Sequence, residues 1–381
     1  MRKVIITSFY YYPENTPRAF RTYELVQEFI RRGYKVELFI PNYNQEYKYN
    51  SNLRIFTVDK KNVRSTQDVI PNNSIKYLLK KSSLCVKFYK IIKYLYYPII
   101  DRYSKCLANE MENLKDEKYD LLISVGLPFS VHQGTAKFLK KHGNNIKTTV
   151  ADYGDPFSFN PVRKIAPWYG IIEKCILNNF DYVSIPTINA KEGYLKLKSE
   201  DKIKVIPQGF NFDLVKVDTY VKNNIPTFSY GGIFYENIRN PKLLFEKLIK
   251  IDKDFRFIIY TNKSSKQLIQ EYIKILGQKL IVKDLVSRER IIYEMSKMDF
   301  LLNLDNISEK QVPSKIIDYT LSGRPIFSMT PIVFDEFKFN QFLNGNYQGQ
   351  LDINIEQYNI INVCQQFIAL MEENKYGESQ Y

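Results

Sequence analysis

The stretch Pro313-Ser-Lys-Ile-Ile-Asp-Tyr-Thr-Leu-Ser-Gly-Arg-Pro-Ile326 predicts a tight loop followed by a helix whose start can hold a phosphorylated ligand. Proline suits the first turn of a helix, and the N–H groups beside Ser314 can donate to an anion, with Lys315 adding positive charge. One turn later, Asp318 supplies a carboxylate that can accept hydrogen bonds from a ribose diol. The glycine and the second proline end the helix. Because an ordinary capped amphipathic helix begins in the same way, the stretch alone leaves both interpretations open.

The length and composition of the chain favour a globular protein of two domains. It has 381 residues, of which 44% are hydrophobic, enough to fill two cores. Its start, Met1-Arg-Lys, leads directly into the apolar run Val4-Ile-Ile6 rather than into a targeting segment with a cleavage site. No run approaches the ~18 apolar residues that a membrane-spanning helix needs. We therefore expect a cytoplasmic protein.

The cysteines are scattered along the chain. Cys85, Cys106, Cys175 and Cys364 show no CxxC spacing. This pattern favours reduced thiols and argues against a structural metal site. We expect each cysteine to be a small core residue rather than a nucleophile.

The net charge of +14, from 55 basic and 41 acidic residues, predicts an anionic partner: nucleic acid, anionic lipid or a nucleotide diphosphate. Basic residues are densest over 74–106, where tyrosines and aliphatic residues lie between them at helical spacing. A helix there could rest on the anionic cytosolic face of a membrane. It could equally pack its apolar side on the first domain and leave its lysines in solvent. No nucleic acid is expected, because no zinc, helix-turn-helix or ribonucleoprotein signature accompanies the charge.

Apolar strand candidates alternate with amphipathic helical segments, which predicts an α/β fold with parallel sheets and right-handed crossovers. A first series of strands is expected at 3–7, 35–40, 53–58, 121–125, 148–152, 182–186 and 203–206, with helices at 18–32, 130–142, 168–179 and 190–197. A second series is expected at 227–231, 255–261, 279–282, 300–303 and 325–328. Loop-like sequence over 207–226 separates the two series.

The opening stretch resembles the Pro-Ser-Lys-x-x-Glu-Tyr-x-x-x-Gly-Lys-Pro signature of family-four-like glycosyltransferases with the GT-B fold. Other segments resemble that family's motifs in the same order. They are Phe9-Tyr-Tyr-Tyr-Pro-Glu14 with Arg18, Arg21 and Gly33-Tyr-Lys-Val36; Ala151-Asp-Tyr-Gly-Asp-Pro156; Val205-Ile-Pro-Gln-Gly-Phe-Asn211; Tyr230-Gly-Gly-Ile-Phe234 with Arg239-Asn-Pro241; and Met298-Asp-Phe-Leu-Leu-Asn303. Together these segments cover most of the chain, and their order is more specific than any one of them.

The resemblance implies a GT-B architecture of two facing, doubly wound Rossmann-like domains, with ligands at the carboxyl ends of both sheets. An acceptor-binding domain would span 1–206 and a donor-binding domain 220–362. The segment 363–381 would contain a helix that crosses back to the first domain. The resemblance also implies a retaining, metal-independent transferase without a cofactor, in which a nucleotide-sugar is a co-substrate.

The donor site implied by the resemblance begins at a glycine pair. Gly231 and Gly232 follow an expected strand and would let the backbone approach the donor phosphates, with a plain tight turn as the alternative. Arg239 would clamp the diphosphate with its forked guanidinium, with a surface ion pair as the alternative.

The same site continues in the opening stretch. Ser314 and Lys315 would contact the phosphates and neutralise the leaving group, while Asp318 holds the ribose. The family often has a glutamate at the position of Lys310, near the sugar hydroxyls. In this chain Glu309, beside it, is expected to take that role.

The acceptor side is expected to involve four residues of the first domain. His132 lies in Gly126-Leu-Pro-Phe-Ser-Val-His132, which resembles the family's Ser-x-Pro-Pro-x-Ser-x-His run. It could assist acceptor activation, or it could be a helix histidine that is hydrogen-bonded to a neighbouring strand. Asp155 could also act on the acceptor, or it could cap a helix after Pro156. Arg18 and Arg21 at the start of the first helix could meet acceptor or phosphate charge, or lie in solvent.

The function implied by the resemblance is transfer of a sugar from a nucleotide-sugar to a glycan or lipid-linked glycan acceptor, in capsule or lipopolysaccharide assembly. One alternative is a degenerate, non-catalytic transferase that serves as a sugar- or nucleotide-binding scaffold. Another is a nucleotide-sugar epimerase or hydrolase on the same fold.

Overall fold

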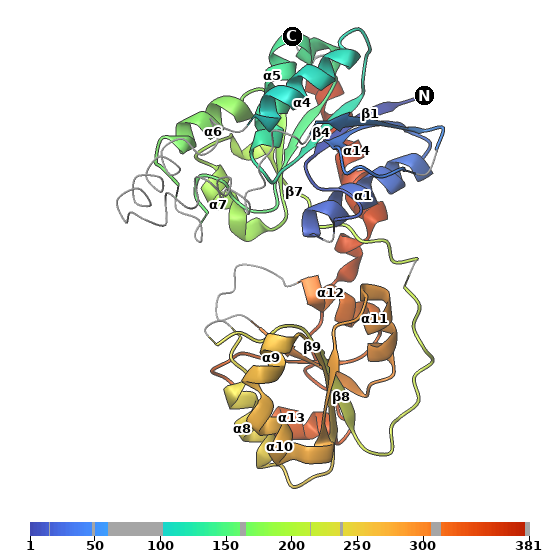
Figure 1. Ribbon diagram of the computed structural model, residues 1–381, viewed down its shortest axis with the longest axis vertical. Helices are drawn as coiled ribbons and strands as arrows, with labels where there is room; N and C mark the ends of the chain where they lie inside the picture. The colour runs from blue at the N-terminus through green and yellow to red at the C-terminus, as the bar shows by residue number, and fades with distance from the viewer. Residues whose placement is uncertain are drawn as a thin grey trace, which may run out of the picture. The chain divides into compact units, whose positions relative to one another are not determined.

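The computed structural model describes residues 1–14, 16–47, 50–59, 102–160, 165–213, 215–236, 239–305 and 314–377, apart from the side chains of 314 and 374–377. The chain divides into two compact units (Figure 1). The first unit comprises Met1–Phe210 with Ile360–Tyr381, and the second comprises Asn211–Asn359. Each unit has its own sheet and its own core.

The first unit is built on a parallel sheet with the strand order β3-β2-β1-β4-β5-β6-β7 among the described residues. Its strands are β1 (Lys3–Ser8), β2 (Lys35–Pro41), β3 (Leu53–Val58), β4 (Leu121–Val125), β5 (Thr149–Asp152), β6 (Tyr182–Ile185) and β7 (Ile203–Val205). The central strands are apolar and buried along their length, as expected of a parallel sheet covered on both faces. All carboxyl ends of these strands therefore lie at one edge.

Helices cover both faces of this sheet. On one face, α1 (Pro17–Arg31) lies beside α14 (Ile360–Gly377), and their buried residues share one core (Figure 1). On the other face, α4 (Tyr103–Met111), α5 (Ser130–His142) and α6 (Tyr169–Leu177) contribute to a second core. α1 begins at Pro17 because the hydroxyl of Thr16 accepts a hydrogen bond from the N–H of Ala19, which caps the helix start.

The helix expected at 190–197 is much shorter than predicted. Only α7 (Lys191–Tyr194) is α-helical, after a 3₁₀ turn at Ile188–Ala190. Glycine at position 193 weakens the helix, and a side chain there would collide with the ring of Phe159. The apolar periodicity of the sequence thus predicted a longer helix than the structure contains.

The second unit is a smaller parallel sheet with the order β10-β9-β8-β11-β12. Its strands are β8 (Thr227–Gly231), β9 (Arg256–Thr261), β10 (Leu280–Asp284), β11 (Phe300–Leu304) and β12 (Ile326–Met329). Its helices are α8 (Lys242–Ile249), α9 (Lys263–Leu268), α10 (Gln270–Leu276), α11 (Arg288–Ser296), α12 (Ser314–Leu321) and α13 (Glu336–Leu343). Three neighbouring strands stack phenylalanine rings in the core, with Phe228 4.6 Å from Phe257 and 4.8 Å from Phe300 between ring centroids.

The basic segment 74–106 lies outside the described residues except for 102–106. There α4 begins, and Tyr103 and Leu107 are fully buried against the first unit. Among the described residues, no helix is long and apolar enough to cross a membrane.

The described cysteines differ in burial, and Cys85 lies outside the described residues. Cys364 is buried and Cys106 is half-buried, but Cys175 is exposed, so the core prediction is wrong for Cys175. It stands on the solvent side of α6, whose opposite side buries Tyr169, Glu173 and Leu177.

Candidate functional site

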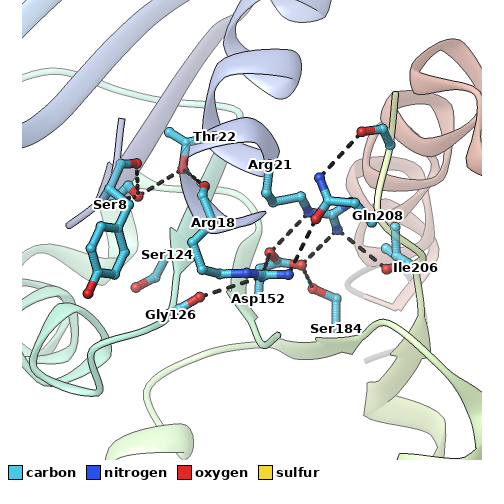
Figure 2. A network of polar contacts seen from close by, with 12 residues as sticks. Ser8, Arg18, Arg21, Thr22, Ser124, Gly126, Asp152, Ser184, Ile206 and Gln208 are labelled. Atoms are coloured by element: carbon cyan, nitrogen blue, oxygen red, sulfur yellow. Dashed lines mark hydrogen bonds and ion pairs between the residues drawn. The ribbon is translucent and has the colours of Figure 1, made fainter. Parts of the chain in front are cut away.

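Asp152 organises a buried polar network at the carboxyl edge of the first sheet (Figure 2). It is the last residue of β5, and both of its carboxylate oxygens accept from Arg21, at 2.8 and 3.2 Å. Ser184 of β6 donates to the same carboxylate at 2.7 Å. Burial alone would raise the pKa of Asp152, but the charges of Arg21 and Arg18 and the hydrogen bonds outweigh burial and hold the pKa below its usual range. Asp152 is therefore an ionised anchor for α1.

Arg21 is a structural residue in this arrangement. It is 1% exposed, and besides Asp152 it donates to the carbonyl oxygens of Pro207 and Ile206. Its guanidinium lies 5.3 Å from the ring centroid of Phe367 on α14. The alternative in which Arg21 lies in solvent is wrong, and its burial leaves little surface for an acceptor to touch.

Arg18, one helical turn before Arg21, is held more loosely. It contacts Asp152 at 3.4 Å, the carbonyl of Gly126 at 3.5 Å and Gln208 at 3.4 Å (Figure 2). These distances exceed the about 2.7–2.9 Å of strong charge-assisted hydrogen bonds. A side chain at Gly154 would collide with the Arg18 guanidinium, which lies against that backbone. Arg18 is thus the arginine of the pair that can still reorient toward an anionic or hydroxyl ligand.

Asp155 is exposed, in contrast to Asp152. Residues 157–160 are not helical, so the alternative role of Asp155 as the cap of a helix directly after Pro156 is not observed. The Asp155 charge is close enough to act on Arg18. Asp155 therefore stands at the rim of the network while Asp152 is its centre.

His132 lies beneath this edge on α5. Its Nδ1 is 2.9 Å from the hydroxyl of Ser124, and its ring centroid is 4.6 Å from that of Tyr153. Its Nε2 is buried without a hydrogen-bond partner among the described residues and lies against the backbone of Gly126. Burial lowers the pKa of His132 to about 3, so the imidazole is neutral at physiological pH. In this form it can accept or donate one hydrogen bond but is not a cationic acid.

Glu173 supports the same region and was missed by the sequence reasoning. It is fully buried on α6, where its carboxylate accepts from the Tyr153 hydroxyl at 2.8 Å and from the N–H of Ser158 at 3.0 Å. Burial raises its pKa. Glu173 thereby holds the loop that carries Asp155. A glutamate on the buried side of an amphipathic helix was the available signal.

In the second unit, the first turn of α12 places Lys315 at the carboxyl edge of the sheet. Its amine nitrogen is buried, lies 5.1 Å from the Tyr230 ring centroid and has no hydrogen-bond partner among the described residues. Burial, and then the nearby charge of Arg239, lower the pKa of Lys315 to about 7. An unpaired buried amine is costly, so this position favours an anionic ligand that would satisfy it.

The glycine pair at the end of β8 makes room for this lysine. A Cβ on Gly232 would collide with the Lys315 amine nitrogen. The hydroxyl of Tyr319 on α12 accepts from the N–H of Gly231 at 2.9 Å and lies 3.2 Å from its carbonyl oxygen. Gly231 is thus tied to α12, and Gly232 leaves the space that the lysine fills.

Asp318 is paired within the unit by a residue that the motif did not indicate. Arg288, the first residue of α11, donates through Nε to Asp318 at 2.7 Å. Burial raises the pKa of Asp318, and Arg288 partly offsets this. The carboxylate remains one-fifth exposed. The separation of the two residues in sequence explains why no local pattern predicted the pair.

The structure thus brings Gly232, Arg239 and Lys315 together. Gly231 is hydrogen-bonded to Tyr319 of α12, and Asp318 is on the same helix. Ser314 is the first residue of α12, but its side chain is not described, and Glu309 lies outside the described residues. Among the described residues, no group of histidine, cysteine or acidic side chains is placed to hold a metal ion.

No protein-family model matches the sequence, and no curated protein matches it. Solved structures do match over the whole chain. The lipopolysaccharide outer core galactosyltransferase WaaB in its apo form matches with a TM-score of 0.62 at 15% identity, over 98% of this chain and 99% of that chain. A glycosyltransferase from Rickettsia africae ESF-5 matches with a TM-score of 0.61 at 11% identity, over 98% of each chain.

HepE from Anabaena, in complex with UDP and glucose, matches with a TM-score of 0.52 at 9% identity over the full length of both chains. At such low identity these likenesses show the fold. The chain has the GT-B fold of these glycosyltransferases, as the resemblance of its motifs predicted.

Proposed function

We propose that this protein is a glycosyltransferase that moves a sugar from a nucleotide-sugar to a glycan or lipid-linked glycan acceptor. The observation that carries the proposal is the buried amine of Lys315 beside Gly232, which has no hydrogen-bond partner among the described residues and lies in the first turn of a helix at the carboxyl edge of the second sheet. Ligands of doubly wound sheets bind at that edge, and a helix start favours phosphate. The GT-B fold supports the same class of reaction.

A bound diphosphate would raise the pKa of Lys315, so that the amine takes up a proton from solvent and donates hydrogen bonds to the phosphate oxygens. The charge of Arg239 nearby and the start of α12 would then stabilise the negative charge that develops on the departing nucleoside diphosphate. Asp318, fixed by Arg288, would present its remaining oxygen to a ribose hydroxyl. These groups supply positive charge without a metal ion, so we propose a metal-independent reaction and, by family resemblance, retention of the anomeric configuration.

The first donor to test is a UDP-sugar. HepE was solved with UDP and glucose, and TarM of S. aureus with UDP and α-GlcNAc-glycerol. WaaB acts on the lipopolysaccharide outer core. We therefore propose an acceptor in surface polysaccharide assembly, met by Arg18 and Asp155 of the first unit.

Calorimetric titration with UDP, GDP, ADP and TDP tests the donor site. We expect one diphosphate to bind, and Lys315→Ala and Arg239→Ala each to weaken binding by about tenfold or more, the value of a lost charge-assisted hydrogen bond. Lys242→Ala is the matched control, because Lys242 is largely exposed and lies 3.8 Å from its acidic neighbour Glu246. Absence of binding by all four diphosphates would refute the proposal.

The same titration has a proton readout. At pH 8 most Lys315 amines are neutral in the free protein, since the pKa is about 7, and a bound diphosphate raises that pKa. Binding should therefore take up protons at pH 8, and the uptake should vanish in Lys315→Met. Repeating the titration in buffers of different ionisation enthalpy measures it. Binding without turnover would favour the scaffold alternative, and donor cleavage without an acceptor would favour the hydrolase.

A further inference from the structure

A cavity of ≈ 630 Å³ lies in the first unit beside α1 and apart from the Asp152 network. We call it the tyrosine pocket, after the four tyrosines that line it. Tyr11 and Tyr12 follow β1, Tyr23 stands on α1, and Tyr47 belongs to the β2–β3 connection. Its volume is within the about 300–1,000 Å³ of small-molecule sites.

The pocket exists because of how β2 is joined to β3. Parallel neighbours are usually connected by a helix that packs on the sheet. Here none of the described residues of the connection, 42–47 and 50–52, is helical. The connection instead lays aromatic side chains beside α1 and leaves a hollow, with Ile30, Leu53 and Ile55 as its apolar surface.

The buried ring of Tyr11 lies between the rings of Tyr23 and Tyr47. Tyr11 is 3% exposed, and its ring centroid is 5.9 Å from those of both Tyr23 and Tyr47, with interplanar angles of 43° and 50°. Tyr23 and Tyr12 are 38% and 61% exposed. Open aromatic rings of this kind stack on the C–H faces of pyranose sugars, because the ring face is electron-rich and the C–H bonds are weakly positive.

The polar groups fit the same ligand class. Gln27 and Asn50 line the pocket with amides that both donate and accept, and Glu46 adds an acceptor. Such groups, with the tyrosine hydroxyls, can pair with the hydroxyls of a sugar.

The charge of the pocket argues against phosphate. No lysine or arginine is among the described residues that line it, although the chain has 55 of them. Glu46 would repel a phosphate group. The charge of Glu46 therefore favours a neutral sugar over a nucleotide or a phospholipid headgroup.

We propose that the tyrosine pocket binds an uncharged pyranose residue of a glycan. Its assignment to a sugar of the acceptor remote from the reacting end rests on the proposed function. Sugar binding itself does not, since it depends only on the pocket.

Saturation-transfer NMR on the full chain tests this inference. The probes are the methyl pyranosides of glucose, galactose, mannose and N-acetylglucosamine, together with maltose and lactose. We expect transfer to the C–H protons of at least one probe and about two- to tenfold weaker binding in Tyr23→Ala, the value of one aromatic contact. Tyr23→Phe should retain more of the binding than Tyr23→Ala does, because it keeps the ring and loses only the hydroxyl. Phe20→Ala is the control, since Phe20 is an equally exposed ring of α1 that does not line the pocket.

Competition separates this site from the donor site. Saturating UDP should leave the sugar signal unchanged, and so should inorganic phosphate. The inference is overturned if no probe shows transfer, if Tyr23→Ala binds as the wild type does, if UDP or phosphate displaces the sugar, or if 1-octanol binds in place of every sugar. A protein that fails to bind UDP but binds sugar here would refute only the proposed function.

Discussion

Two carboxylates of one short run, Asp152 and Asp155, have different roles at the scale of the residue. Both stand in Ala151-Asp-Tyr-Gly-Asp-Pro156, and the sequence favoured Asp155 as the chemical group. The structure buries Asp152 under two arginines and a serine, and it leaves Asp155 exposed. Asp152 therefore holds the edge of the first sheet together, while Asp155 remains available to a ligand.

Asp152→Asn should strongly lower the free energy of unfolding of the first unit. It removes the charge that compensates the buried Arg21, and breaking such a pair costs about 3–5 kcal/mol. Asp155→Asn is the matched control and should change the free energy of unfolding by less than about 0.5 kcal/mol. Thermal or urea unfolding measures both. Equal stability of the two variants would show that the Asp152 network contributes little.

His132 should remain neutral across the physiological range. Its pKa is about 3 in the folded protein, whereas an unfolded histidine has a pKa near ~6.5. Below that value only the unfolded state takes up the proton, so the contribution of His132 to stability falls as the pH falls from about 6.5 toward 3. Since the chain has two histidines, NMR of the imidazole C–H groups with a His132→Asn reference gives the assignment. A His132 titration midpoint near neutrality would contradict the prediction.

At the scale of the element, α12 and the end of β8 together form the proposed donor site. Tyr319 bonds the backbone of Gly231, and Lys315 of the same helix lies over Gly232. The helix ends at Leu321, before Gly323 at φ 71°. The local sequence predicted this ending, because glycine adopts a positive φ readily and proline cannot continue a helix.

Gly232→Ala should weaken UDP binding by about tenfold or more. The new methyl group would occupy the position of the Lys315 amine, and this flexible side chain would swing away from the phosphates. Gly143→Ala is the control, because an added Cβ there meets no atom within 4 Å. Calorimetry gives the affinities. If Gly232→Ala binds UDP with unchanged affinity, Lys315 does not contribute to donor binding.

At the scale of the whole molecule, the chain consists of two units with separate sheets and separate cores. α14 at the end of the chain belongs to the first unit, where Arg32 donates to Gln365 and to the carbonyl oxygen of Ile361. The second unit is stabilised by long-range hydrogen bonds, such as the one that the N–H of Thr227 donates to the carboxylate of Asp299 at 2.7 Å. A ligand of the second unit should therefore stabilise that unit selectively.

Scanning calorimetry should show two unfolding transitions, of which UDP raises one. At a UDP concentration of 100 times the Kd, the gain is about 2.7 kcal/mol for the unit that binds it. Asp152→Asn should lower the other transition. A single transition that moves as a whole with UDP would contradict independent unfolding of the units.

The sequence by itself determined the class of fold and the positions of most elements. The strands at 53–58, 121–125 and 227–231 and the helix at 130–142 have the predicted bounds. Apolar runs, helical periods and end signals are local properties, so they can be recognised without the rest of the chain. The same holds for the glycine pair and for the start of α12.

Only the tertiary structure decided which side chains remain available for chemistry. The Arg21–Asp152 pair joins residues 131 positions apart, and the Arg288–Asp318 pair joins residues 30 apart. Burial, and with it the lowered pKa of Lys315 and His132, depends on neighbours brought in from distant segments. The physical reason is that desolvation and ion pairing depend on distance in space, whereas the sequence records only distance along the chain.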